Sequence, residues 1–178
     1  QVNFIKTLMN PDAQLFCVGD DWQSIYGFRG SDVQYIVEFN RFFKDAKCIS
    51  LNTNYRSAPN IVDASSEVIR NNRFMVDKIV KAQKKSRKKI EVYSAIDFED
   101  GVAFAVQEVK ELLAQNIPND QILFLYRRSK MFEPYREQLK KEKIYVNAKT
   151  IHAAKGLESK VVFIVGLTQG NGGFPDVW

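Results

Sequence analysis

Apolar residues occur along the chain in two kinds of segment: short continuous runs and longer stretches with a helical period. The runs at residues 15–18, 122–126 and 161–165 are unbroken, which is typical of strands covered on both faces. Segments that also favour an extended backbone are residues 47–51, 90–94 and 145–151. The pattern therefore predicts several short strands spread over most of the sequence.

The longer stretches repeat an apolar residue every three or four positions, which predicts helices with one buried face. We expect them at residues 2–9, after Ser31 or Asp32, after Ala58-Pro59, after Asp97 and from Ser129. Proline is tolerated in a first helical turn, and Ser31, Asp32 or Asp97 can cap one. The expected buried faces are Val33, Ile36, Val37 and Phe43; Ile61, Ala64, Ser65, Val68, Ile69 and Asn72; Val102, Ala105, Val106, Val109, Leu112 and Leu113; and Phe132, Tyr135 and Leu139.

Strands that alternate with helices predict an α/β fold with a mostly parallel sheet and helices on both faces, in three layers. The carboxyl ends of parallel strands meet at one edge, where such sheets bind ligands. Polar loops follow residues 18, 51 and 151, each directly after an expected strand. These loops are therefore expected to lie along one edge. Residues 170–175 are expected to form a loop at the end of the chain.

Composition narrows the class of protein only modestly. The 178 residues carry a net charge of +5, which permits a polyanionic partner without requiring one. Basic residues crowd residues 78–89, where we favour a solvated connector over a nucleic-acid contact because no aromatics are interleaved. Two cysteines form neither a disulfide framework nor a zinc pattern, so a reducing compartment is expected.

No membrane span or signal peptide is expected from the sequence, since no apolar stretch approaches the ~20 residues that a span needs. The chain opens Gln-Val-Asn-Phe and lacks an initiating Met. We therefore expect it to begin inside a longer protein.

The first polar loop, residues 18–32, concentrates chemistry in few positions. Gln23 offers a donor and an acceptor, and Arg29 offers a rigid cationic fork. Trp22, Tyr26 and Phe28 are flat side chains that suit either core packing or stacking on a base. From these residues alone, a loop pinned by aromatics and a binding loop both stay open.

Two further loops favour the interpretation of the first loop as a binding loop. The second loop, residues 51–57, reads Leu-Asn-Thr-Asn-Tyr-Arg-Ser, and the third, residues 150–158, reads Thr-Ile-His-Ala-Ala-Lys-Gly-Leu-Glu. Together and in this order, the three loops resemble motifs III, IV and V of the UvrD/Rep-type superfamily I DNA helicases. The tail from residue 165 to 175 is similar to family sequence as well. The sequence Asp-Asp-Trp-Gln in the first loop most resembles the DNA helicase IV branch of this family.

The resemblance implies RecA-like motor domains and a nucleotide role for several residues. Gln23 would sense the γ-phosphate of ATP, and Tyr55 would lie against the adenine. Arg56 would reach the γ-phosphate across a cleft between two domains, as an arginine finger does. Arg29 would lie near the nucleotide, and Glu158 would reach its sugar.

The resemblance also implies a track for single-stranded DNA. Phe28 would stack on a base, with Tyr26 beside it. Thr150, His152 and Lys155 would hold the DNA backbone. His152 is the only histidine, and no set of metal ligands surrounds it, so no metal site is expected within this chain.

The sequence departs from the family where it lacks a phosphate loop and an Asp-Glu-x-Gln-Asp motif. It also lacks room for the family's large inserted subdomain, because Arg56 and His152 are only 96 positions apart. We therefore expect a fragment: residues 1–45 end the first motor domain, and residues 46–178 form most of the second.

The expected function is part of an ATP-dependent DNA helicase, translocating 3′ to 5′ and acting in the cytoplasm at the nucleoid. ATP and Mg²⁺ would serve the full-length protein, whereas this fragment alone would hold neither tightly and hydrolyse nothing. Its expected partners are DNA and the missing N-terminal motor domain. The alternatives are a non-enzymatic nucleic-acid-binding module and a polymerase-associated, helicase-like protein that kept the motor fold.

Overall fold

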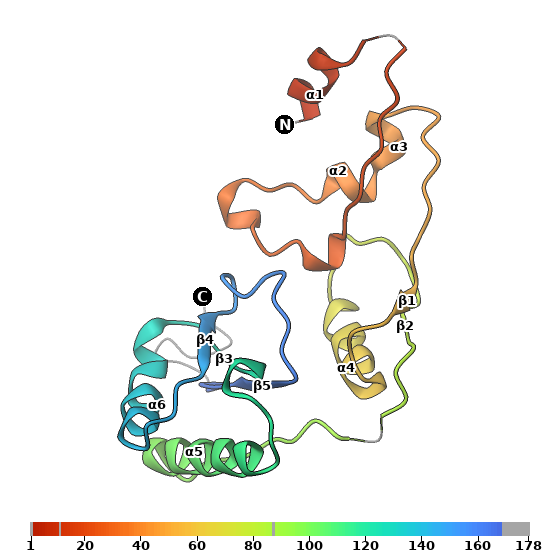
Figure 1. Ribbon diagram of the computed structural model, residues 1–178. Coiled ribbons are helices and arrows are strands. Elements are labelled where there is room, and N and C mark those ends of the chain that lie inside the picture. Colours follow the sequence, from red (N-terminus) through yellow and green to blue (C-terminus); the bar gives the residue numbers. More distant parts are fainter. Residues whose placement is uncertain (1, 11, 87, 169–178) are drawn as a thin grey trace. The chain divides into compact units, whose positions relative to one another are not determined.

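The computed structural model describes residues 2–10, 12–86 and 88–168 (Figure 1). Packing divides the chain into two compact units, Gln1–Glu91 and Val92–Trp178, and each is described by itself. The domain boundary that we place between residues 45 and 46 rests on the sequence motifs. It stays a prediction, separate from the boundary between these two compact units. The loop predicted for residues 170–175 lies outside the described residues.

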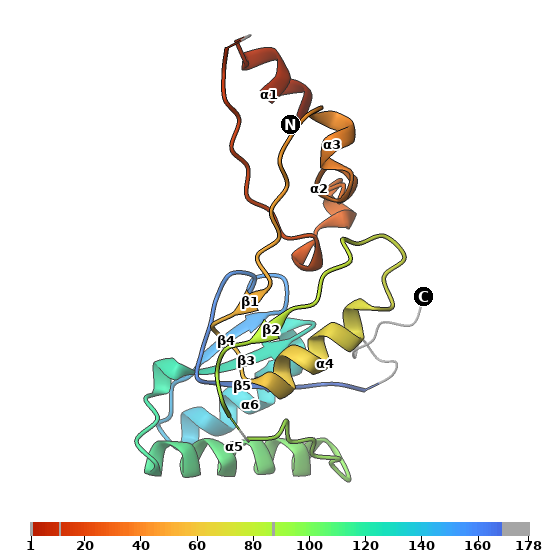
Figure 2. The same ribbon diagram turned by 90° about the vertical axis from the view of Figure 1, so that its right-hand side faces the viewer.

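The second unit is built on a parallel three-stranded sheet (Figure 2). Strand β3 (Ile122–Tyr126) is central, with β4 (Asn147–Thr150) on one side and β5 (Val161–Ile164) on the other. Phe124 pairs in register with Ala148 of β4 and Phe163 of β5. The predicted parallel α/β arrangement is thereby confirmed, and all three strands present their carboxyl ends at one edge.

Two long helices cover this sheet. Helix α5 (Phe98–Ala114) begins where the Asp97 carboxylate accepts a hydrogen bond from the Asp100 backbone N–H, as predicted. Helix α6 (Ser129–Lys141) follows β3 and packs against α5. The fully buried side chains are Val109, Ile122, Phe124 and Leu139, and each such residue contributes about 1.5–3 kcal/mol by leaving water.

The core shows which face the helices cover. Ile122, Phe124 and Tyr126 alternate along β3 and therefore share one face, where α5 and α6 both contribute to the same cluster. Within the described part of this unit, α5 and α6 both lie on that face (Figure 2). Strand β5 differs from expectation, because Val162 and Ile164 are about half exposed at the edge of the sheet.

The first unit has shorter elements. They are α1 (Val2–Leu8), the 3₁₀ turns η1 (Asp21–Gln23) and η2 (Gly27–Arg29), α2 (Gln34–Val37), α3 (Phe39–Phe42), β1 (Thr53–Asn54), α4 (Pro59–Ile69) and β2 (Lys81–Ala82). The two short strands pair in parallel, with Thr53 opposite Lys81. Among its described residues, only Val62 and Asp21 are buried. This unit is therefore held together by polar contacts more than by a core.

Several predictions for the first unit and the linker after it were wrong. No strand forms at residues 15–18, 47–51 or 90–94, and Phe16 and Val18 are 90% and 82% exposed. A strand exists only when a neighbour satisfies its backbone N–H and C=O groups, and no described segment pairs with these runs. The helix expected from Val33 is split into α2 and α3 at Glu38.

Helix α4 forms where predicted, but its predicted buried face is mostly open. Only Val62 is fully buried, while Ile61 and Val68 are 48% and 70% exposed. The reason is that the backbone hydrogen bonds of a helix are internal to it, whereas burial of one of its faces requires a neighbouring segment. Across the described residues, none of the helices has the length and apolar character that crossing a membrane would take.

Candidate nucleotide- and DNA-binding segments

The first loop, residues 18–32, is shaped by its own backbone contacts. The Asp20 carboxylate caps η1 by accepting a hydrogen bond from the Trp22 N–H at 3.2 Å. Gly30 ends η2 in the left-handed conformation, with φ of +79°, which a glycine adopts without strain. Gly19 lies so close to Ile36 that a β-carbon there would stand 2.6 Å from the Ile36 side chain. Gly19 and Gly30 therefore allow the backbone path that this loop takes.

The aromatic residues of this loop surround its arginine. The Arg29 guanidinium lies 5.4 Å from the ring centre of Tyr26 and 5.6 Å from that of Phe28, within range of cation–π attraction. Phe28 is nonetheless 70% exposed. A flat ring held by a cation and open to solvent can accept a stacked base, as the resemblance implies for this position.

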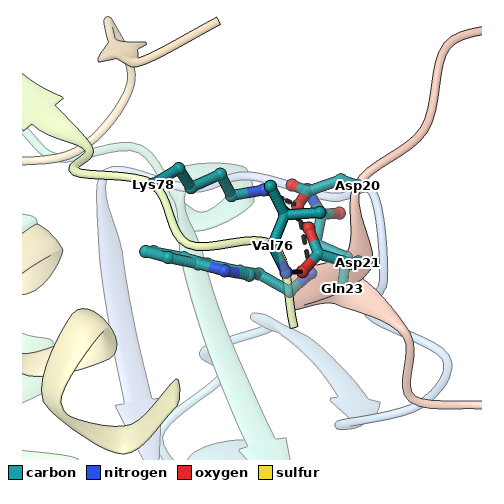
Figure 3. Close-up of polar contacts among 6 residues, drawn as sticks. Asp20, Asp21, Gln23, Val76 and Lys78 are labelled. Carbon is teal, nitrogen blue, oxygen red and sulfur yellow. Dashed lines mark hydrogen bonds and ion pairs between the residues drawn. The ribbon is translucent and has the colours of Figure 1, made fainter. Parts of the chain in front are cut away.

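Two adjacent carboxylates of this loop reach a distant segment of the same unit. Asp21, whose side chain is 2% exposed, accepts hydrogen bonds from the Val76 backbone N–H at 2.7 Å and the Lys78 ammonium at 2.9 Å (Figure 3). Asp20 accepts a second bond from Lys78 at 3.0 Å. We call Asp20, Asp21 and Lys78 the acid–lysine cluster.

Gln23 is tied directly into this cluster. Its side-chain N–H donates to Asp20 Oδ2 at 2.6 Å, while Lys78 donates to Oδ1 of the same carboxylate (Figure 3). Burial raises the pKa of Asp20, but the bonds from Lys78 and Gln23 and the Lys78 charge outweigh it, so the pKa lies below the usual range. Burial lowers the pKa of Lys78, and its bonds to Asp21 and Asp20 more than reverse this, so the pKa is raised.

The indole ring of Trp22 packs against the acid–lysine cluster. Lys78 Nζ lies 4.9 Å from its ring centre, and its indole N–H is buried with no hydrogen-bond partner among the described residues. Trp22 also lines an open pocket of about 360 Å³ beside α4, together with Asp20, Gln23, Ser65, Val68 and Ile69. The face of α4 that we expected to be buried thus borders the loop that carries Gln23.

The second loop, residues 51–57, presents its aromatic and its arginine at a tight turn. The Asn54 side-chain oxygen accepts hydrogen bonds from the backbone N–H groups of Arg56 at 3.0 Å and Ser57 at 2.8 Å. Tyr55 is 65% exposed and Arg56 is also exposed. The amide of Asn54 therefore holds the turn while both neighbouring side chains face solvent.

The third loop, residues 150–158, belongs to the second unit and follows β4 at the carboxyl edge of the sheet. The Thr150 hydroxyl oxygen accepts a hydrogen bond from the Ala153 N–H at 3.2 Å, which begins a run of turns. His152 is half-buried, and Lys155 and Glu158 are exposed. The position of this loop at the strand ends agrees with the expectation from the sequence.

Within the first unit, the structure links two of the three predicted loops. The segment from Val76 to Ala82 contacts the first loop and pairs with β1, which lies within the second loop. The sequence missed this link. Lys78 was read as part of a solvated connector, yet its side chain is 15% exposed and doubly ion-paired. Nothing in the local pattern marks a residue whose partners are 57 and 58 positions away.

The acidic residues do not suggest a metal centre. No group of three or more His, Cys, Asp or Glu side chains that could hold a metal ion occurs in the part of the chain that the structure describes. The magnesium that the family resemblance implies is therefore not assigned to any of these residues.

Comparison with known proteins decides the family. Residues 49–149 match the UvrD-like helicase C-terminal domain, and residues 1–44 match the UvrD/REP helicase N-terminal domain. The chain belongs to the UvrD-like helicase family. This membership confirms the resemblance to the family, and the matched residues include the first and second loops. The domains of UvrD-like helicases have RecA-like folds.

Individual relatives agree with this membership. The chain is 33% identical over 144 residues to a protein of Mycoplasma capricolum named as a probable DNA helicase II homolog, and equally to the ATP-dependent DNA helicase PcrA of Staphylococcus epidermidis. These alignments cover 81% of this chain and 20% of each relative. PcrA of Staphylococcus aureus is 34% identical over 127 residues, 71% of this chain and 17% of the relative. The chain therefore spans about a fifth of the length of the curated relatives it matches.

Proposed function

We propose that this UvrD-like chain is part of an ATP-dependent DNA helicase, supplying the second-domain half of its ATP cleft and part of its single-stranded DNA track. The observation that carries the proposal is the joint occurrence of three family loops whose functional side chains are accessible. Phe28, Tyr55 and Arg56 are exposed, and so are Lys155 and Glu158. Large aromatic and charged side chains kept at the surface are available to a ligand.

In this proposal the nucleotide is recognised from several sides. Gln23 bonds the γ-phosphate through its amide, and Tyr55 stacks on the adenine. Arg56 brings a positive charge to the γ-phosphate when the cleft closes, with rate effects on the order of 10³–10⁵ in other phosphoryl-transfer systems. Arg29 lies near the nucleotide, and Glu158 accepts a hydrogen bond from its sugar.

The DNA contacts use different chemistry. Phe28, supported by Tyr26, stacks on a base, which contributes on the order of 1–3 kcal/mol per base. Thr150, His152 and Lys155 bond the phosphate backbone. A net charge of +5 favours this polyanion, and binding is expected to weaken as salt rises.

Turnover requires parts that this chain does not supply. We propose that the missing N-terminal motor domain provides the phosphate loop and that Mg²⁺ enters with ATP, held by residues outside this chain. Cleft closure on ATP and reopening after hydrolysis would shift the grip on DNA, 3′ to 5′, because two ligands then bias two closure states. Such a motor would act at the nucleoid in the cytoplasm.

The test is DNA-stimulated ATP hydrolysis by the full-length protein, with Arg56→Ala compared against Arg41→Ala. Arg41 is an exposed arginine that forms an ion pair with Glu38 of its own turn, so its loss should leave turnover unchanged. Arg56→Ala should lower kcat by about 10³-fold or more. Unchanged turnover in that variant would refute the arginine-finger assignment. Salt-sensitive DNA binding by the full-length protein without any hydrolysis would instead indicate the non-enzymatic binding module.

A further inference from the structure

We propose that Lys78 is a positioning residue that joins the loop carrying Gln23 to the turn carrying Tyr55 and Arg56, so that the two nucleotide contacts move as one. The inference rests on the proposed function for its consequence in turnover, and on the acid–lysine cluster for its geometry. Lys78 itself would touch neither ATP nor DNA.

The first step is electrostatic. Asp20 and Asp21 are adjacent carboxylates, and Asp21 is nearly inaccessible to water. Lys78 is the residue whose ammonium bridges both, at 3.0 and 2.9 Å, from a position on a separate segment (Figure 3). It offsets one of two negative charges beside Gln23. Without it, the pair would repel the triphosphate that Gln23 is proposed to bind, since like charges disfavour a shared site.

The second step is the fixing of Gln23. Asp20 uses one oxygen for Lys78 and the other for the Gln23 amide, so the orientation of this carboxylate sets that of the amide (Figure 3). A carboxylate held by a charge-assisted hydrogen bond has a defined rotamer, and it fixes the orientation of a group that is hydrogen-bonded to it. Loss of Lys78 therefore releases Asp20 and, through it, Gln23.

The third step is the connection to the arginine. Beyond Lys78, the chain enters β2, where the Lys81 N–H donates to Asn52 O and the Gln83 N–H to Asn54 O, both at 2.8 Å. The side chain of Asn54 in turn accepts from the Arg56 N–H. A pathway thus runs from Gln23 to Arg56 through hydrogen bonds and through the four residues that separate Lys78 from Gln83.

The experiment measures DNA-stimulated ATP hydrolysis by the full-length protein with Lys78→Met, and with Lys84→Met as the matched control on the same basic segment. Lys84 is exposed, so its loss should change nothing. Lys78→Met should lower kcat about tenfold, within the range usual for coupling between sites, with the KM for ATP changed less than twofold. In a Gln23→Ala background, Lys78→Met should cause no further loss, because Lys78 acts through Gln23. Full activity, or a separate tenfold loss in that background, would overturn the proposal.

Two further measurements keep the result decisive. If Lys78→Met fails to fold because Asp21 is left unpaired, Asp21→Asn with Lys78→Met removes both charges, and its kcat should still fall about tenfold below that of Asp21→Asn alone. If the wild-type protein shows no DNA-stimulated turnover, the proposed function fails. The ¹H–¹⁵N NMR signals of this 178-residue chain then decide the geometry: Lys78→Met should shift the Gln23 side-chain amide and the Arg56 backbone amide, and Lys84→Met neither. An unshifted Arg56 signal would refute the connection.

Discussion

Replacing Lys78 by Met should destabilise the first unit by about 3–4 kcal/mol, because the change leaves the buried Asp21 carboxylate without its cation. Removing one partner of a buried ion pair costs about 3–5 kcal/mol. Here Lys78 is 15% exposed and Asp21 keeps its bond from Val76, which places the expected cost at the lower end. The bond to Asp20 adds under about 1 kcal/mol, since that carboxylate is 40% exposed.

This loss is large for a unit in which only Val62 and Asp21 are buried among the described residues. The assay is urea unfolding of the 178-residue chain followed by Trp22 fluorescence, with Trp178→Phe leaving Trp22 as the single tryptophan. Adding Asp21→Asn to Lys78→Met should recover most of the stability, because the buried charge is then gone while the Val76 N–H keeps an acceptor. A double variant no more stable than Lys78→Met would refute the electrostatic reasoning.

Three further outcomes follow from the contacts of both units. Because folding lowers the pKa of Asp20 and raises that of Lys78, the cluster should stabilise the first unit fully between roughly pH 5 and pH 10. Its contribution should fall as acid protonates Asp20 and as alkali deprotonates Lys78, and urea unfolding at pH 3, 7 and 11 measures this; equal stability at all three would contradict it. Phe124→Ala should cost the second unit about 3–5 kcal/mol by circular-dichroism melts, whereas the same change at half-exposed Phe98 should cost clearly less. Asn54→Ala should destabilise the second loop by about 1 kcal/mol, while Asn54→Asp, which keeps the accepting oxygen, should not; equal losses would disprove the turn's dependence on that oxygen.

The sequence predicted the positions of helices better than those of strands. The reason is that the hydrogen bonds of a helix join neighbouring residues, whereas those of a strand join distant segments. Helix α5 begins at its Asp97 cap and helix α4 at Pro59, because the signals and the hydrogen bonds of a helix lie within a few residues. Residues 15–18 are as apolar as a buried strand, yet they form none, because no described neighbour pairs with them. Strand β3 does form, since β4 and β5 flank it.

The candidate site follows the same division. The sequence by itself determined the family resemblance and the identity of Gln23, Tyr55 and Arg56 as candidate residues, because motifs are runs of neighbouring residue types. Only the tertiary structure showed that Lys78 lies beside the carboxylates of the first loop, 57 and 58 positions away in the sequence. One lysine of the basic run is thereby the ion-pair partner of the buried Asp21 carboxylate. The physical reason is that burial and ion pairing depend on which distant segments meet, and a local pattern of charges does not contain that information.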